Sequence, residues 1–126
     1  MSVLGIGVDI VDCARIEHSL ERFGERFLQR VFTRGEIAYC QSVKFPARHF
    51  AARFAAKEAV SKAFGTGIGK AMGWRDIDLH RHESGQPFIV LEAGAKQLAT
   101  ERGVSSLWVS LSHTDDHAVA TVVIEA

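Results

Sequence analysis

The sequence predicts an α+β fold in which an antiparallel sheet packs against one long helix. In several segments apolar and polar residues alternate with the period of two that is typical of strands. An alanine-rich stretch over residues 46–64 has the length and composition of a helix. Most of the predicted strands follow this helix, which favours α+β over alternating α/β architecture. The 126 residues fit a single domain that covers 1–126.

Turn and cap signals place the elements in order. Val3 to Val11 is predicted to be a strand, and residues 13–32 one helix, or two helices interrupted at Gly24. Thr33, with Glu36 three residues later, has the pattern of a capping box and predicts a short helix to about residue 42. The remaining predictions are a helix over 46–64, strands around 77–79 and 88–91, a helix over 93–102, and strands over 107–112 and 118–124.

The first predicted strand has two very different faces. One face is aliphatic and is expected to lie in the core; it carries Leu4, Ile6, Val8 and Ile10. The other face carries two glycines and Asp9. Because glycine has no side chain, this second face allows another backbone or a ligand to come close.

Composition and charge limit the classes of function. The chain has 15 basic and 15 acidic residues, so it lacks the overall positive charge that attracts nucleic acid. The charge is uneven, because residues 1–70 hold 11 Lys and Arg against 7 Asp and Glu. This imbalance predicts a local positive surface for an anionic ligand or an acidic partner.

No signal in the sequence indicates a membrane protein. No apolar run reaches the roughly 20 residues that a membrane-spanning helix needs. The two cysteines, Cys13 and Cys40, lie far apart and lack metal-ligand spacing. We therefore expect reduced thiols in a cytoplasmic protein.

Charged residues interrupt the long predicted helix in the stretch RFAAKEAVSKAFGTGIGK, residues 53–70. Glu58 and Lys62 continue a row of apolar residues spaced by four, so Glu58 lies at the edge of an apolar face. A carboxylate there is costly unless it is paired, hydrogen-bonded or bound to a metal. One explanation is an ion pair between Glu58 and Lys62. The other is that Asp9 meets Glu58, since two carboxylates can hold Mg²⁺ together with substrate phosphates.

Several neighbouring groups could bind those phosphates. Arg53, Lys57 and Lys62 would supply positive charge, although Lys57 has no firm role. The glycine-rich loop after the helix could offer backbone N–H groups, but its spacing fits neither Walker A nor GxGxxG. His113 lies at the end of a predicted strand. It could contact a phosphate or a base of the ligand, or it could be an ordinary histidine of a turn.

The predicted helical segment after the first strand carries regular rows of charge. Arg22, Arg26 and Arg30 recur every four residues and so lie along one side of a helix. A solvated face with weak ion pairs explains this pattern. A basic docking strip for an acidic partner is the more specific alternative.

Three stretches together resemble the holo-acyl-carrier-protein synthase family of small 4′-phosphopantetheinyl transferases. They are GIGVDIVDCARI at 5–16, RFAAKEAVSKAFGTGIG at 53–69 and VSLSHTDDHAVATVVIE at 109–125. The resemblance implies transfer of 4′-phosphopantetheine from coenzyme A to a serine of apo acyl carrier protein, with Mg²⁺, releasing adenosine 3′,5′-bisphosphate. It also implies a homotrimer that binds coenzyme A between subunits.

The resemblance assigns roles by position. Asp9 and Glu58 match the metal-binding carboxylates, and Lys62 matches a lysine near the reacting pyrophosphate. Around the nucleotide and its 3′-phosphate, the matching residues are Arg53 and His113, with Gly65, Thr66 and Gly67 beside the adenosine. In the helix that meets the acidic carrier protein, they are Arg15, Arg22 and Arg26.

Two questions stay open at this point. The proton of the carrier serine could pass to Glu58 directly or to a metal-held water. The chain could also be a non-catalytic module that binds coenzyme A or another nucleotide. The paired carboxylates argue against such a module, because binding a polyanion alone is better served by cations.

Overall fold

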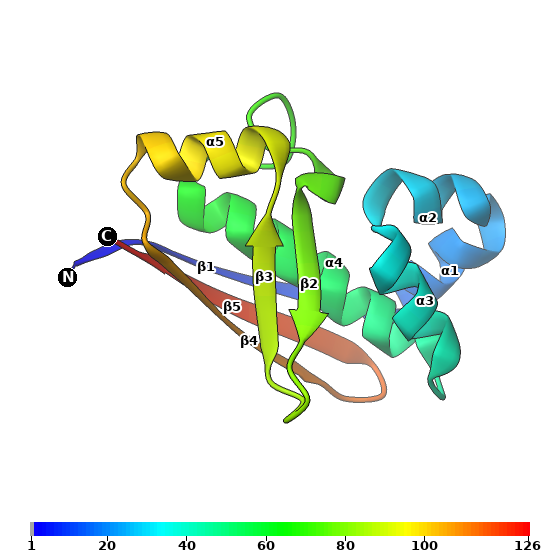
Figure 1. Cartoon of the computed structure of the whole chain (residues 1–126). Helices are drawn as coiled ribbons and strands as arrows, with labels where there is room; N and C mark the ends of the chain where they lie inside the picture. The colour runs from blue at the N-terminus through cyan, green and yellow to red at the C-terminus, as the bar shows by residue number, and fades with distance from the viewer. Residues whose placement is uncertain (1) are drawn as a thin grey trace.

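The computed structural model describes residues 2–126 and confirms the predicted α+β class (Figure 1). Every predicted helix and strand is present, and the first helical segment is divided into two helices at Gly24. In chain order the elements are β1 (Val3–Asp12), α1 (Cys13–Phe23), α2 (Glu25–Val31), α3 (Arg34–Ser42), α4 (Pro46–Phe64), the 3₁₀ turn η1 (Trp74–Asp76), β2 (Ile77–Arg81), β3 (Pro87–Leu91), α5 (Ala93–Glu101), β4 (Ser106–His113) and β5 (His117–Glu125).

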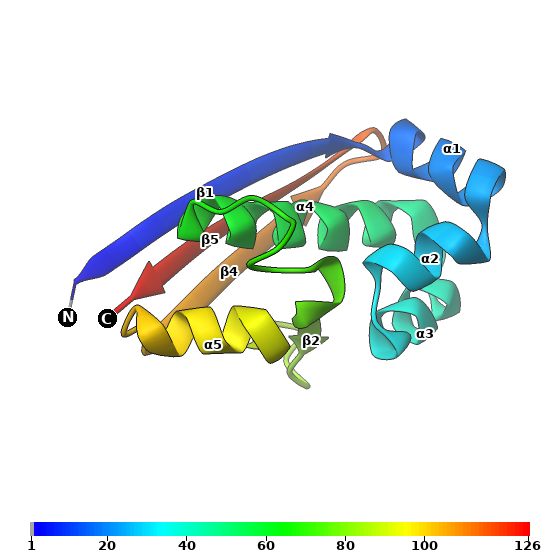
Figure 2. The same ribbon diagram turned by 90° about the horizontal axis from the view of Figure 1, so that it is seen from above.

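The strands form two antiparallel sheets, one on each side of α4 (Figures 1 and 2). The larger sheet has the order β1-β5-β4, so β1 and β4 are its two edges. Strands β2 and β3 pair only with each other and, with α5, cover the other side of α4. Alternation in sequence predicted the strands but not this division, because it does not specify the partner of a strand.

The two faces of β1 are oriented opposite to the sequence-based expectation. Gly5 and Gly7 face α4, and a Cβ atom on either would lie 2.0 Å from a main-chain oxygen of that helix. The aliphatic face that was expected in the core is exposed instead, with Ile6 at 69% and Ile10 at 67%. The expectation was wrong because the helix approaches the side on which glycine leaves room for its backbone.

Lys57 forms a buried ion pair with Glu36 in the middle of the molecule. Its Nζ lies 2.9 Å from Oε1 of Glu36, and both side chains are fully buried. The same ammonium donates hydrogen bonds to the carbonyl oxygens of Trp74, at 3.0 Å, and Ile77. Burial lowers the pKa of Lys57, and the Glu36 carboxylate opposes that shift. Lys57 is therefore a structural cation and does not face a ligand.

Glu36 extends this network to two further elements. Its Oε1 accepts the N–H of Thr33 at 2.8 Å, and its Oε2 accepts the N–H of Leu79 at 2.8 Å. The Thr33 hydroxyl accepts the N–H of Glu36 in return, which confirms the predicted capping box. The pair thus joins α3 to α4, η1 and β2, and fixes the small sheet against the long helix.

No helix among residues 2–126 is both long enough and apolar enough to span a membrane. Helix α4 is continuous, but charged residues interrupt its apolar sequence.

Replacing Lys57 by methionine should lower the free energy of unfolding by about 3–5 kcal/mol, because it leaves the Glu36 carboxylate buried and unpaired. Urea denaturation at a fixed protein concentration measures this loss. The double change Lys57→Met with Glu36→Gln should recover part of it, since no buried charge then remains. Lys96→Met, at an exposed position of α5, is the control, and an equal loss there would contradict the role of the buried pair.

Candidate functional site

Asp9 and Lys62 meet where β1 crosses α4. Asp9 lies on the glycine face of β1, and its side chain is only 16% exposed. The Lys62 Nζ lies 2.9 Å from Oδ1 of Asp9 and also donates to the carbonyl oxygen of Val8 at 3.1 Å. The close contact of β1 with α4 brings together two residues that are 53 positions apart. Lys62 thus pairs with Asp9, and not with Glu58 as the surface-pair explanation required.

Glu58 lies one helical turn before Lys62 and belongs to the same group. Burial raises the pKa of Glu58, and the Asp9 carboxylate raises it further, while Lys62 and Arg15 oppose the shift. These influences indicate that the four charged groups lie close together along the β1 flank of α4. We call Asp9, Glu58, Lys62 and Arg15 the carboxylate cluster.

The carboxylate cluster has the donors that a hard divalent cation needs. Two carboxylates, one mostly buried, supply oxygen ligands to Mg²⁺, which prefers one or two carboxylates plus substrate phosphates. Among residues 2–126, no group of three or more His, Cys, Asp or Glu side chains could hold a metal alone. The donor set therefore fits a Mg²⁺ ion that shares its coordination with a phosphate ligand.

A second group of charged residues surrounds a pocket of about 300 Å³ on the other flank of α4. His49 and Arg53 come from α4, Arg81 from the end of β2 and His113 from the end of β4. The rings of His49 and His113 face each other with centroids 5.2 Å apart. We call this the cationic pocket. It includes Arg53 and His113, the two residues that the resemblance assigned to the nucleotide.

Arg53 is buried yet incompletely hydrogen-bonded. Its side chain is 2% exposed, with Nη1 donating to the carbonyl oxygen of His49 at 3.3 Å and no partner for Nε. The guanidinium lies over the Tyr39 ring, 4.5 Å from its centroid. A buried donor without an acceptor is costly, so an anionic oxygen in the pocket would complete its hydrogen bonding.

The carboxylate cluster and the cationic pocket do not meet within one chain. Arg53 and Lys62 are nine residues apart on α4, which places them on opposite sides of the helix and about 13 Å apart along its axis. Asp9 and His113 lie on β1 and β4, the two edges of the larger sheet. The two groups are therefore on different flanks of the protomer, which the sequence could not reveal.

The loop after α4 does not offer the free N–H groups that its glycines suggested. The N–H of Gly65 bonds to the carbonyl oxygen of Lys62, and those of Thr66 and Gly67 bond to that of Ser61. These bonds cap the helix end, where Gly65 has a left-handed conformation with φ 76°. Gly65, Thr66 and Gly67 are exposed beside Lys62, and any contact they make with a ligand does not depend on free amides.

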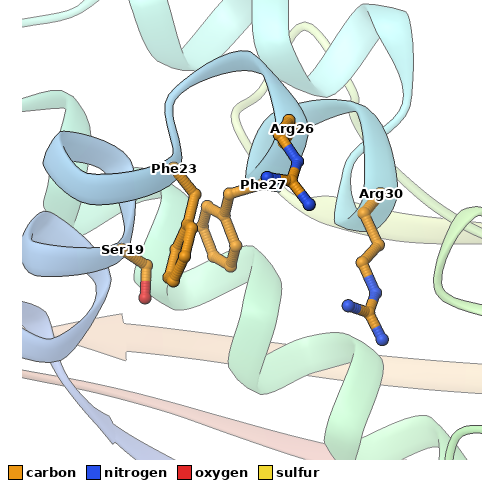
Figure 3. Close-up of a pocket in the computed structure, with 5 residues that line it drawn as sticks. All are labelled: Ser19, Phe23, Arg26, Phe27 and Arg30. Atoms are coloured by element: carbon orange, nitrogen blue, oxygen red, sulfur yellow. The ribbon is translucent and has the colours of Figure 1, made fainter.

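The predicted arginine strip faces solvent on α1 and α2 (Figure 3). Arg26 and Arg30 line a pocket of about 250 Å³ together with Ser19, Phe23 and Phe27. In Figure 3 the two phenylalanine rings lie side by side, the Arg26 guanidinium is near the Phe27 ring, and the Arg30 side chain lies farther from the rings. The surface thus combines positive charge with partly exposed aromatic rings. This combination favours a docking surface over a purely solvated face.

Arg22, the third arginine of the strip, and Arg15, which the resemblance also assigned to the partner, have separate positions. Arg22 lies over the exposed ring of Phe23, 5.4 Å from its centroid. Arg15 lies over Phe54, 5.6 Å from its centroid, and belongs to the carboxylate cluster. Arg15 therefore connects the arginine surface with Glu58.

Four residues of these sites were missed or left unassigned in the sequence. His49 precedes Arg53 by four residues, a helical spacing that could have indicated a shared face. Arg81 ends a strand, and only the fold brings it to His113. Phe23 has no signal of its own. Arg30 belonged to the predicted row of arginines but was not assigned to the partner site, because the pocket that it lines depends on the bend between α1 and α2 at Gly24.

The chain matches known proteins over nearly its whole length. A family model described as the 4′-phosphopantetheinyl transferase superfamily matches residues 5–122. A holo-[acyl-carrier-protein] synthase of Koribacter versatilis is 46% identical over 98% of both chains, and one of Pseudoalteromonas atlantica is 44% identical over 100% of this chain and 99% of the relative.

Solved structures agree with these relatives. The crystal structure of holo-[acyl-carrier-protein] synthase from Neisseria meningitidis is 35% identical with a TM-score of 0.92, covering 99% of this chain and 100% of that one. The Helicobacter pylori enzyme in complex with coenzyme A is 38% identical with a TM-score of 0.85, covering 95% and 99%. Fold, charged clusters and sequence matches agree, and the chain belongs to the 4′-phosphopantetheinyl transferase superfamily.

Proposed function

We propose that this protein is a holo-[acyl-carrier-protein] synthase that moves 4′-phosphopantetheine from coenzyme A to a serine of apo acyl carrier protein. The other product is adenosine 3′,5′-bisphosphate. The observation that carries the proposal is the meeting of Asp9, Glu58 and Lys62 in a chain that matches such synthases from end to end. A relative bound to coenzyme A supports the co-substrate.

The carboxylate cluster would carry out the transfer. Asp9 and Glu58 are the residues that would hold Mg²⁺, and a bound ion would supply Lewis-acid catalysis for the leaving phosphate. Lys62 can leave Asp9 to neutralise charge that develops on the phosphate oxygens. The proton of the carrier serine passes to Glu58 or to a water held beside it. The protein mainly positions and neutralises groups, as is usual in phosphoryl-type transfer.

The oligomer completes this proposal. The outer face of the larger sheet is an exposed apolar surface on which Ile6, Val123 and Trp108 lie opposite one another across the three strands. An apolar surface of this kind indicates an interface. The two charged groups lie on different flanks, so a head-to-tail ring can place the carboxylate cluster of one subunit beside the cationic pocket of the next. We therefore propose a homotrimer with coenzyme A bound between subunits.

The arginine surface is the proposed docking site for the acidic carrier protein. Arg22, Arg26 and Arg30 offer positive charge, and the rings of Phe23 and Phe27 offer apolar contact. Electrostatic complementarity of this kind guides association and orientation. Arg15 lies between this surface and Glu58, so a carrier docked here would present its serine near the carboxylate cluster.

The remaining parts of the proposal concern location and partners. A cytoplasmic location is consistent with two free, buried cysteines and with the absence of a membrane-spanning helix among residues 2–126. We propose neither nucleic acid nor membrane as a partner, because the net charge of the chain is zero.

Asp9→Asn and Glu58→Gln should each lower kcat/KM for transfer by at least about 100-fold, because each removes a ligand charge from the metal. Mass spectrometry of apo carrier protein incubated with coenzyme A and Mg²⁺ detects the added phosphopantetheine. Asp12→Asn is the matched control, since this exposed carboxylate of β1 pairs with His117. If the unmodified protein binds coenzyme A but never transfers it to a competent carrier, the chain is instead a binding module.

Mixing two inactive variants tests whether the site is shared between subunits. Asp9→Asn and Arg53→Ala subunits, co-refolded in equal amounts, should regain about one quarter of wild-type activity, because that share of interfaces contains both intact groups. The control mixture of Asp9→Asn with Glu58→Gln has both defects in one group and should remain inactive. Equal activity in the two mixtures, or a protein that sediments as a monomer, would refute the shared site.

Arg26→Glu should raise KM for the carrier protein by roughly tenfold or more, because it places a negative charge against an acidic partner. The affinity for coenzyme A, measured separately by calorimetry, should stay unchanged. Lys96→Glu, at an exposed position of α5, is the control for net charge, because α5 does not pack against α1 or α2. Equal KM values for the two variants would contradict the docking site and favour the explanation that the arginine strip is only a solvated surface.

A further inference from the structure

We infer that Tyr39 and Thr33 of α3 are positioning residues for the cationic pocket, because they keep its two arginines out of an ion pair with Asp78. Tyr39 supports Arg53 and Arg81, and Thr33 holds the Asp78 carboxylate. The inference rests on the proposed function, which supplies coenzyme A as the ligand of the pocket. It gives a role to two residues that the proposed reaction leaves unassigned.

The Tyr39 ring contacts three groups of the cationic pocket. The guanidinium carbon of Arg53 lies 4.5 Å from the ring centroid, and that of Arg81 lies 5.3 Å from it. The His49 ring meets the Tyr39 ring edge-on, with centroids 5.9 Å apart. A guanidinium is planar and weakly hydrated, so an aromatic face orients it without using its hydrogen-bond donors. Tyr39 thus holds both arginines in place and does not consume their N–H groups.

A carboxylate that could neutralise these arginines is close to them. Asp78 of β2 lines a hollow of about 210 Å³ together with Tyr39, Arg53 and Arg81. The ion pairs found among residues 2–126 nevertheless include neither arginine with Asp78. A carboxylate is a strong partner for a guanidinium, because it can accept two parallel N–H bonds. Some feature of the fold must therefore keep Asp78 and the two arginines apart.

Both oxygens of Asp78 have other partners. The Thr33 hydroxyl donates to Oδ1 at 2.7 Å, and Nε2 of His80 lies 2.8 Å from Oδ2. The Thr33 hydroxyl is also the cap of α3 and accepts the N–H of Glu36. Glu36 in turn accepts the N–H of Leu79, the residue after Asp78. Helix α3 therefore fixes the position of Asp78 beside it and occupies one of its oxygens.

Helix α3 thus separates the two sides of a potential ion pair. Thr33, at its N-terminal cap, binds the carboxylate, and Tyr39, further along the helix, supports the guanidiniums. An arginine that is paired with a carboxylate must give up that pair before it binds an anion, which lowers its affinity for the anion. Without the Tyr39 ring, both arginines can turn toward Asp78. The affinity for coenzyme A then falls although every cation of the pocket is still present.

Tyr39→Leu tests the inference, because it removes the ring and keeps an apolar side chain. Calorimetric titration of the assembled protein with coenzyme A should show an affinity about tenfold lower, the order expected for the loss of both ring contacts. Asp78→Asn alone should change the affinity by less than about threefold. The double variant should return to within about threefold of wild type, since no carboxylate then remains to pair with the arginines. KM for coenzyme A should follow these affinities, and kcat at saturating coenzyme A should change little.

Three controls separate positioning from folding. Tyr39→Phe keeps the ring and should bind coenzyme A as wild type does. Ile37→Ala removes apolar packing from the same helix, so it should lower the stability to urea without the coupling to Asp78→Asn. Thr33→Val frees one oxygen of Asp78 and also removes the helix cap, so Asp78→Asn should recover its affinity but not its stability. Stability is measured for every variant, because Asp78 also raises the pKa of the buried Lys57.

The coupling between the two positions decides the outcome. If Asp78→Asn raises the affinity by the same factor with and without the Tyr39 ring, Asp78 acts only as a general charge and the inference is wrong. A loss in Tyr39→Phe equal to that in Tyr39→Leu, or a loss confined to kcat, would also overturn it. If the unmodified protein neither binds coenzyme A nor transfers a group from it, the proposed function fails instead.

Discussion

The close approach of β1 to α4 is the constraint on which the site depends. A Cβ on Gly5 or Gly7 would lie 2.0 Å from a helix carbonyl oxygen, so only glycine permits this distance. The approach brings Asp9, on the same face as the glycines, to the Lys62 ammonium. It also determines which face of β1 remains outside. The buried pair of Lys57 and Glu36 then fixes the other side of α4 to α3 and β2, so the helix is held on both sides.

A helix held in this way presents different chemistry on opposite flanks. The periodicity of α4 directs Glu58 and Lys62 toward the β1 edge and His49 and Arg53 toward the β4 edge. A single protomer therefore has one group with carboxylates and one with only cations. If both groups bind parts of the same phosphorylated ligand, as we propose, two subunits must associate to form one complete site. The exposed aliphatic face of β1 is the surface that we propose for such association.

The sequence predicted local structure well and distant contacts poorly. Caps and periodicity located each element, including the Thr33 capping box and the break at Gly24, because these depend on neighbouring residues. The face of β1 was assigned wrongly, since alternation reports two different faces but not which one the same chain covers. Asp9 could be connected with Glu58 because a carboxylate interrupts a glycine face. Lys57 and Arg81 could not be interpreted, because their partners lie on elements that only the tertiary fold brings near.

The absence of a familiar phosphate-binding motif also has a structural reason. Walker A and dinucleotide-binding loops place free N–H groups at a helix N-terminus, where the dipole attracts anions. Here the glycine loop follows the C-terminus of α4, and the N–H groups of Gly65, Thr66 and Gly67 already cap that helix. The proposed phosphate contacts therefore come from side chains such as Lys62 and Arg53, which lie on separate turns of the helix. No short sequence pattern encodes side chains from separate turns, and for that reason only the three stretches taken together indicated the family.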